Sequence, residues 1–133
     1  MNSGLVYLDS SAIIKLVFEE DDTDALLTFL QTRPQRVSSA LARIEVLRIV
    51  SRAQDPLPLR EAKRVLSALD LIRMDDDIVT RAAALEPAGL RSLDAVHLAT
   101  AQMLGHHLAG MVVYDRTLAA AAKAADITVW SPK

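Results

Sequence analysis

The chain has 133 residues, of which 51% are hydrophobic and 24% charged, and its formal net charge is −2. This composition is typical of a globular protein, and the length suits one domain. The absence of cysteine excludes disulfides, thiolate metal sites and cysteine nucleophiles. No apolar run approaches the roughly 20 residues of a membrane helix, and the start lacks the basic segment of a secretory signal. We therefore expect a cytoplasmic protein with no membrane partner.

The first half of the chain alternates short apolar runs with longer amphipathic segments. The run Leu5–Leu8 ends in Asp9 and predicts a buried strand, after which a helix begins at Ser10 or Ser11. A weaker strand is expected at 37–38. Further helices are expected at 24–32, at 40–52 and from the prolines of 54–59 to about 69.

The second half continues the alternation. Strands are expected at 71–74, 111–114 and 128–130. Helices are expected from the acids at 75–77 to near 87, from a capping Ser92 to 105, and after Asp115. Short strands separated by helices are typical of βαβ units, whose parallel sheet is covered by helices. Since no stretch resembles a domain linker, we expect one three-layer α/β/α domain over residues 1–133.

Two aspartates follow predicted strands directly. Asp9 comes after LVYL and Asp115 after MVVY. Because ligands bind beyond the carboxyl ends of parallel strands, both carboxylates are expected at one functional edge of the sheet. Neighbouring strands lie about 4.8 Å apart, so these two acids could share one cation. Magnesium, which prefers oxygen ligands and keeps several waters, suits such a pocket.

Each candidate acid also has a purely structural interpretation. Asp9 and Asp115 are well placed to cap helices, and Asp94 lies in a first helical turn where the dipole favours an acid. Glu45 lies among apolar residues of a predicted helix. An ion pair with Arg48 would explain it, and so would a partly buried glutamate that faces a metal pocket. The residues alone leave both interpretations open.

Positive charge is concentrated in residues 33–64, which hold eight cations against three acids. When the four candidate site acids are set aside, 15 cations face 13 acids, so the remaining surface is mildly basic. Such a segment suits either an ordinary solvated helical surface or contacts to a phosphate backbone. The candidate phosphate contacts are Arg43, Arg48, Arg52 and Arg64.

The three histidines are expected to have minor roles. His97 lies three residues after Asp94 on the same predicted helix and is expected to be a local hydrogen-bond partner of it, not a catalyst. His106 and His107 have no third ligand nearby, so a zinc site is not expected.

Four segments of the chain resemble the motifs of the PIN domain family. The family's first acid corresponds to Asp9 in LVYLDSSAIIKLV, and its second to Glu45 in ARIEVLR. Its third corresponds to Asp94 in RSLDAVHLATA, and its fourth to Asp115 in MVVYDRTLAAAA. Together the segments span residues 5–122 in the family's order. The last two are the most specific.

The compact size resembles the VapC toxins of bacterial toxin–antitoxin pairs. This resemblance implies a parallel sheet in the order 3-2-1-4-5 and a Mg²⁺ or Mn²⁺ site formed by Asp9, Asp94 and Asp115. It also implies a homodimer that is inhibited by a cognate VapB-type antitoxin. Ser11 matches a family hydroxyl that supports the acidic cluster. Val113 stands where the family often has threonine, which makes Asp115 the least typical of the acids.

The resemblance implies a Mg²⁺-dependent endoribonuclease that leaves a 5′-phosphate and a 3′-hydroxyl. The metal would activate water and offset charge on the phosphate, and Glu45 would orient that water or accept its proton. The main alternative is a PIN-fold protein that binds RNA or a protein partner without cutting. Two phosphotransfer folds fit poorly. Ser11 stands where a haloacid dehalogenase needs its second aspartate, and only the terminal Lys133 follows the last strand, where a receiver domain needs lysine.

Overall fold

The computed structural model describes residues 4–133 and contains a parallel sheet. Across these residues five strands lie in the order β3-β2-β1-β4-β5, which confirms the order that the resemblance implies. The strands are β1 (Leu5–Leu8), β2 (Arg36–Ser39), β3 (Asp70–Ile72), β4 (Leu108–Val112) and β5 (Val129–Trp130). The first three residues of the expected domain lie outside the described residues.

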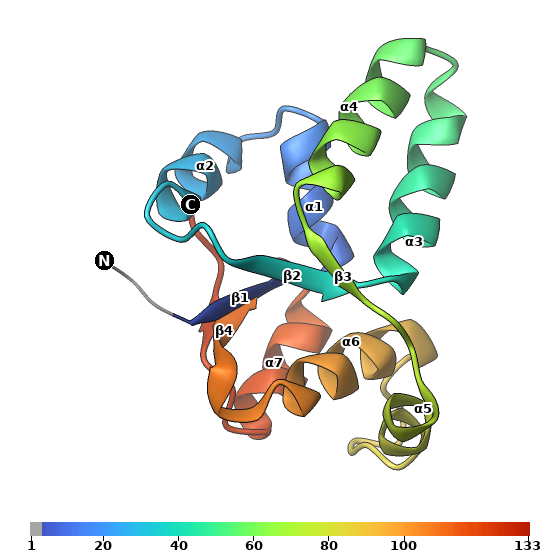
Figure 1. The fold of residues 1–133 in the computed structure, drawn as a ribbon, viewed down its shortest axis with the longest axis vertical. Coiled ribbons are helices and arrows are strands. Elements are labelled where there is room, and N and C mark those ends of the chain that lie inside the picture. The colour runs from blue at the N-terminus through green and yellow to red at the C-terminus, as the bar shows by residue number, and fades with distance from the viewer. Residues whose placement is uncertain (1–3) are drawn as a thin grey trace.

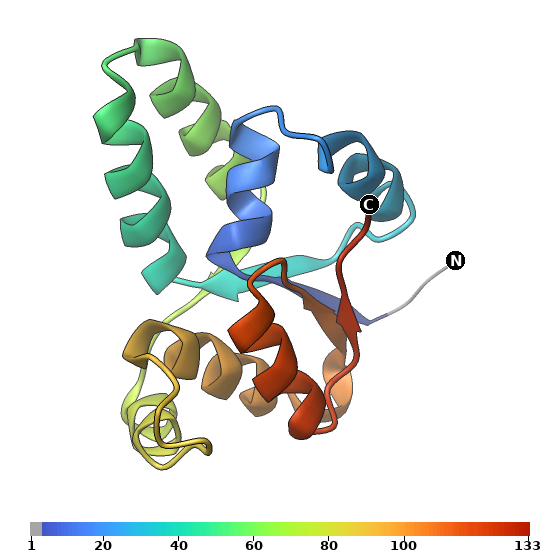
Figure 2. The same ribbon diagram turned by 180° about the vertical axis from the view of Figure 1, so that it is seen from behind.

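Helices cover both faces of the sheet. They are α1 (Ser10–Val17), α2 (Thr23–Leu30), α3 (Leu41–Val50), α4 (Pro56–Ser67), α5 (Asp76–Ala83), α6 (Ser92–Met103) and α7 (Arg116–Ala124), with short 3-10 turns η1 (Ser51–Ala53) and η2 (Gly105–His107). One face carries α1 to α4 and the other carries α5 to α7 (Figures 1 and 2). The expected three-layer α/β/α fold is confirmed. None of the helices in residues 4–133 is long and apolar enough to cross a membrane.

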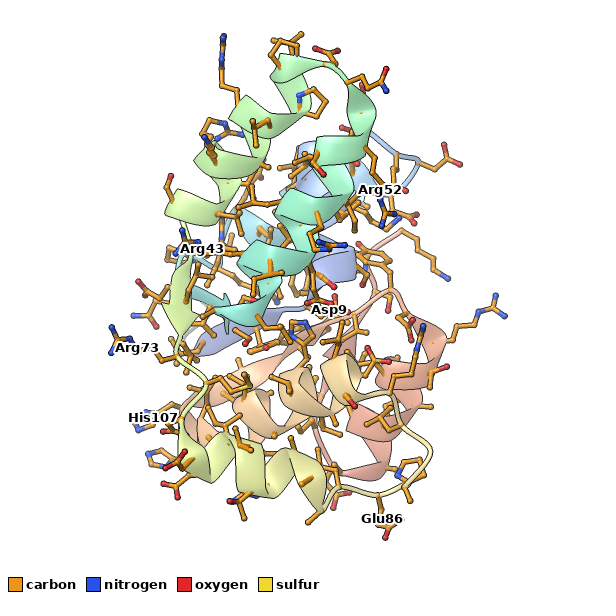
Figure 3. The ribbon with its side chains drawn as sticks, turned by 90° about the vertical axis from the view of Figure 1, so that its right-hand side faces the viewer. Asp9, Arg43, Arg52, Arg73, Glu86 and His107 are labelled. Atoms are coloured by element: carbon orange, nitrogen blue, oxygen red, sulfur yellow. The ribbon has the colours of Figure 1, made fainter. Side chains whose placement is uncertain are left out.

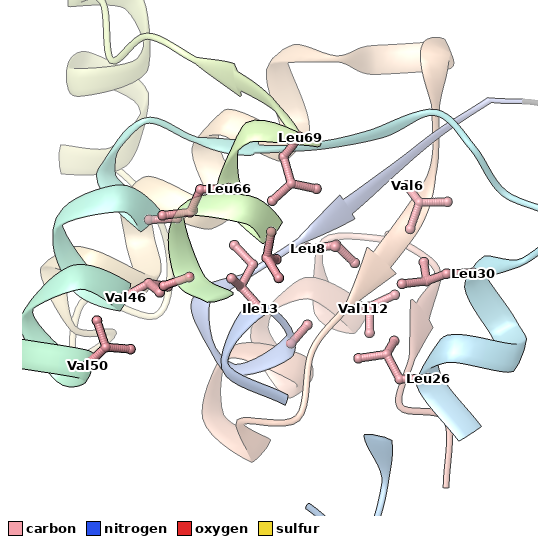
Figure 4. Close-up of a cluster of buried hydrophobic side chains, with 14 residues drawn as sticks. Val6, Leu8, Ile13, Leu26, Leu30, Val46, Val50, Leu66, Leu69 and Val112 are labelled. Atoms are coloured by element: carbon pink, nitrogen blue, oxygen red, sulfur yellow. The ribbon is translucent and has the colours of Figure 1, made fainter. Parts of the chain in front are cut away.

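The central strand β1 is buried on both faces, as its continuous apolar run predicts. Successive side chains of a strand point to opposite faces, so β1 contributes to two cores. Val6 and Leu8 pack into the core beneath α1 to α4, together with Ile13, Val46 and Val112 (Figure 4). Tyr7 faces the other layer, in a cluster with Leu98, Met111 and Leu118. The residue after β1 therefore emerges between the two layers.

Within residues 4–133, four helices have an aspartate N-cap whose side chain bonds the first turn. Asp9, Asp55, Asp75 and Asp115 have extended backbones, and each accepts a hydrogen bond from an amide N–H in the first turn of its helix. The expected cap at Ser92 is wrong. The extended backbone ends at Arg91 (φ −62°, ψ 148°), which makes Arg91 the N-cap without a side-chain hydrogen bond and Ser92 the first helical residue.

Strand β4 begins three residues earlier than expected and ends at Val112. Its early residues, Leu108 and Gly110, pair with β1, but glycine in a strand obscures the apolar pattern that marks the strand in the sequence. Gly110 leaves room for the indole ring of Trp130, which packs against it. Asp115 consequently lies three residues beyond the end of β4 and does not follow the strand directly.

We predict that Gly110→Ala destabilises the fold. A Cβ at this position would lie 2.7 Å from the Trp130 ring and 2.9 Å from the Thr128 carbonyl oxygen, both too close for contact. Urea denaturation should show a loss of about 1–3 kcal/mol in the free energy of unfolding, the usual cost of overpacking. Gly89→Ala is the matched control, because nothing lies within 4 Å of its Cβ. Equal stability of the two variants would contradict the prediction.

Candidate active site

Asp9 lies at the end of the central strand, between the two helical layers (Figure 3). Only 2% of the residue is exposed. The Ser11 hydroxyl donates a 2.6 Å hydrogen bond to Oδ1 of Asp9, and the Ala12 N–H donates a 3.0 Å bond to the same atom. The Ser11 oxygen in turn accepts the backbone N–H of Tyr114 at 3.0 Å. Ser11 thus contacts Asp9, as expected, and also connects it to the segment that leads to Asp115.

The charge on Asp9 is unfavourable in this environment. Burial raises the pKa of Asp9 to about 6, because the bonds from Ser11 and Ala12 only partly compensate the carboxylate for its lost hydration. The nearby charge of Glu45 acts in the same direction as burial. A cation or a proton bound to Asp9 would offset this unfavourable negative charge.

Glu45 extends from α3 and is held from two sides. Its Oε1 lies 2.7 Å from Nε2 of His97 on α6, and its Oε2 accepts a 3.3 Å hydrogen bond from the Ser10 hydroxyl. In the described part of the chain, Glu45 pairs with His97 and not with Arg48. Of the two interpretations that the sequence left open, the structure therefore supports the partly buried glutamate that faces a pocket.

Asp94 and Asp115 lie on either side of the Arg91 guanidinium. Arg91 Nε is 3.9 Å from Oδ2 of Asp94, and Arg91 Nη2 is 3.8 Å from Oδ2 of Asp115. Oδ2 of Asp94 is buried and has no hydrogen-bond partner within residues 4–133. Burial, followed by the charge of Asp115, raises the pKa of Asp94. Arg91 therefore only partly offsets the negative charge around Asp94.

All four predicted acids and Ser11 line one open cleft of about 590 Å³. The acids come from four places in the chain: Asp9 after β1, Glu45 on α3, Asp94 on α6 and Asp115 before α7. A fifth acid, Glu20, also lines the cleft, where it pairs with Lys15. Other lining residues include the apolar Ile14, Ile49 and Leu93 and the cations Lys15 and Arg91. The topology thus gathers the acids at the edge of the sheet where β1 and β4 end, as the sequence predicts.

The oxygen atoms around this cleft suit a hydrated divalent cation. Within residues 4–133, no three acidic or histidine side chains converge closely enough to enclose a metal ion by themselves. Magnesium does not need such enclosure, because it usually keeps several waters and binds through one or two carboxylates. The buried, unpartnered Oδ2 of Asp94 provides one available ligand atom. The donor set therefore fits Mg²⁺ or Mn²⁺ bound partly through water.

Sequence reasoning assigned one residue at this site the wrong partner and missed another. His97 does not hydrogen-bond Asp94 but contacts Tyr7 and Glu45, and no local spacing reveals partners 90 and 52 residues away. Arg91 was not singled out, although its position three residues before Asp94 is the spacing of an ion pair on a helix. That spacing was the available signal.

The basic segment 33–64 divides into engaged and exposed cations. Arg36 donates to the carbonyl oxygens of Arg33 and Leu30, and Arg64 pairs with Glu61. Arg64 is therefore a poorer candidate for phosphate binding than expected. Arg43, Arg48 and Arg52 are exposed. Arg43 lies near the start of α3 and Arg52 just past its end (Figure 3).

A family model described as PIN domain matches residues 6–123. The chain belongs to the PIN domain family. The match includes all four acids of the cleft.

This PIN domain is similar to curated and solved proteins over nearly its whole length. It is 46% identical over 127 residues to Ribonuclease VapC46 of Mycobacterium tuberculosis, an alignment that covers 96% of this chain and 97% of that protein. It is 40% identical over 132 residues to Ribonuclease VapC35 of the same species, with the same coverage. A solved toxin–antitoxin complex from Klebsiella pneumoniae has a TM-score of 0.74 at 23% identity, covering 96% of this chain and 98% of that chain. The expected resemblance to VapC proteins is confirmed.

We predict that Asp9→Asn stabilises the metal-free protein at neutral pH. Asparagine cannot ionise, yet its Oδ1 can accept the bonds from Ser11 and Ala12. Folded Asp9 binds a proton below pH about 6, whereas an unfolded aspartate does so only below about 3.9. Between these values the folded state holds more protons, so the stability of the wild type falls as the pH rises.

The measurement is urea denaturation in EDTA from pH 4 to pH 8. At pH 7.5 the Asp9→Asn variant should be more stable by roughly 1–3 kcal/mol, and the difference should shrink toward zero at pH 4. Asp70→Asn, at an exposed strand position, serves as the control and should show no such trend. A variant that is no more stable than the wild type at pH 7.5 would refute the prediction.

Proposed function

We propose that this PIN domain is a metal-dependent endoribonuclease and the toxin of a toxin–antitoxin pair. The observation that carries the proposal is the convergence of four carboxylates on one cleft, with buried Asp9 at its centre and an unpartnered oxygen on Asp94. The relatives named Ribonuclease VapC support the choice of RNA as the substrate. The similar fold in a toxin–antitoxin complex supports an antitoxin as the partner.

In this proposal Asp9, Asp94 and Asp115 hold Mg²⁺ or Mn²⁺. When bound there, such an ion would supply Lewis-acid chemistry that makes water a better nucleophile and offsets charge on the phosphate. Glu45 accepts the proton of the attacking water. Its Oε1 is held by His97, which leaves Oε2, bonded only weakly to Ser10, as the atom that receives the proton. Hydrolysis then gives a 5′-phosphate and a 3′-hydroxyl.

Two cations line the cleft, and they differ in how free they are to bind phosphate. The Lys15 ammonium lies 3.6 Å from Glu20, 3.4 Å from Asp22 and 4.6 Å from the centre of the Tyr114 ring, so it is already engaged. Arg91 has a side chain that is 78% exposed and only long contacts to the acids. We assign contact with the scissile phosphate to Arg91, which can leave the acids when a divalent cation takes its place.

The protein partners in this proposal are a second copy of the chain and an antitoxin. Several large apolar side chains are exposed on the described surface and suit covering by a partner. On α3 and at the start of α6 these are Ile44, Ile49 and Leu93, which are 58%, 40% and 47% exposed. Ile49 and Leu93 line the cleft, so an antitoxin that covers them would block access to the acids.

We predict that purified protein cleaves RNA only with Mg²⁺ or Mn²⁺, and that EDTA abolishes cleavage. Asp94→Asn should lower the rate by about 100-fold or more, because a charged ligand is lost in the transition state. Asp70→Asn, an exposed acid outside the cleft, should retain full activity. Cleavage in EDTA, or full activity of Asp94→Asn, would refute the proposed mechanism. RNA binding without cleavage would favour the non-catalytic alternative.

We also predict that Mn²⁺ or Mg²⁺ raises the melting temperature of the wild type. A cation that binds only the folded state stabilises it, by about 2.7 kcal/mol at 100 times its Kd. Asp94→Asn should show a much smaller rise, since it loses the unpartnered ligand oxygen. NaCl at matched ionic strength controls for screening. An equal rise with NaCl, or in the variant, would exclude binding at this cleft.

A further inference from the structure

His97 is a buried residue whose two ring nitrogens both have partners. It lies within α6 at 1% exposure. The Tyr7 hydroxyl, on β1, is 2.7 Å from Nδ1, and Oε1 of Glu45, on α3, is 2.7 Å from Nε2. The Tyr7 and His97 rings also meet edge to face, with centroids 5.8 Å apart. One side chain thus joins the central strand to the helix that carries Glu45.

The partners determine which nitrogen carries the proton. A carboxylate only accepts hydrogen bonds, so Nε2 of His97 carries the hydrogen and donates it to Glu45. The Tyr7 hydroxyl, 2.7 Å from Nδ1, can then donate its hydrogen to that nitrogen. The hydroxyls of Ser38 and Thr100 lie near the Tyr7 hydroxyl. They donate to the carbonyl oxygens of Leu8 and Val96 and not to His97. With its hydrogen on Nε2, His97 satisfies the contacts to both Tyr7 and Glu45.

We propose that His97 is a positioning residue that fixes the orientation of the Glu45 carboxylate, and that Tyr7 sets the tautomer this requires. Glutamate has three side-chain torsions, and an unanchored carboxylate would sample many orientations. The buried anchor at Oε1 directs the remaining oxygen toward the cleft, which holds the base ready for its water. This inference rests on the proposed endoribonuclease function, in which Glu45 accepts the proton.

Two substitutions of His97 separate positioning from packing. His97→Gln places an amide N–H near the position of Nε2 and can still donate to Glu45. His97→Asn is shorter and retains a polar atom near Nδ1 for Tyr7, but it cannot reach Glu45. Both remove the ring from the same buried space. A role in packing alone predicts similar losses in the two variants, whereas positioning predicts that only His97→Asn is severely impaired in turnover.

The test measures kcat and KM for RNA cleavage in Mg²⁺, with melting temperatures for every variant. His97→Asn should lose about 10- to 100-fold in kcat with little change in KM. Such a loss is typical when a residue that hydrogen-bonds and orients an active-site side chain is replaced. His97→Gln should restore most of that loss. Adding His97→Asn to Glu45→Gln should cost nothing further, because the two residues act as a unit. Thr100→Val, a buried change on the same helix, should leave kcat unchanged.

The tautomer is tested without any measurement of activity. The chain has three histidines, and His106→Gln with His107→Gln removes the two exposed ones. A long-range ¹H–¹⁵N spectrum of that variant should show one imidazole protonated at Nε2. An Nδ1-protonated ring would overturn the inference even if the His97 variants fail to fold. Full kcat in His97→Asn, with Glu45→Gln impaired, would overturn it and leave the proposed function standing. A wild type that does not cleave RNA would overturn both.

Discussion

The site depends on one electrostatic constraint, which is that four partly or fully buried carboxylates line one cleft. The parallel sheet creates this constraint, since β1 and β4 end on the same side and bring Asp9 and Asp115 toward each other. Two helices from opposite layers add Glu45 and Asp94. Like charges in a region of low dielectric repel strongly, and each also loses hydration. The other polar features of the cleft can be understood as responses to this repulsion.

Three of the acids are compensated differently, and the differences match the roles that we propose. Asp9 receives two neutral hydrogen bonds, which orient it but leave its pKa raised. Glu45 is oriented through His97, a donor that is itself held by the core. Asp94 keeps a buried oxygen without a hydrogen-bond partner in the described structure. An unsatisfied buried group is costly, and such groups persist where function requires them. Asp94 therefore offers a cation a buried oxygen atom that no hydrogen bond occupies.

Local pattern was sufficient to predict most of the fold, whereas the resemblance to the PIN domain family supplied the strand order and the membership of the acidic cluster. Apolar runs located β1 and β2, and the strand–helix alternation indicated a parallel sheet, whose geometry brings strand-end acids together. The contacts between acids and their partners were beyond such reasoning, because they join distant segments. Glu45 faces His97 rather than Arg48 only because α3 and α6 approach from opposite layers. The early start of β4 could not be predicted, because Gly110 interrupts the apolar pattern of the strand. Glycine suits this position because a side chain there would collide with the Trp130 ring.

Arg91 shows why a divalent cation and the phosphate are linked in the proposed reaction. At 3.8 and 3.9 Å from two acids, and with its side chain 78% exposed, it offsets only a small part of their repulsion. A divalent cation at the same position would interact more strongly with both carboxylates, because the Coulomb energy scales with charge and inversely with distance. The guanidinium would then be released beside the cleft, where a phosphodiester brings the next negative charge. Its planar fork suits two phosphate oxygens better than one long contact to each acid. Because Arg91 contacts the two acids only weakly, it leaves most of their repulsion in place. For the same reason its guanidinium stays available to bind the substrate.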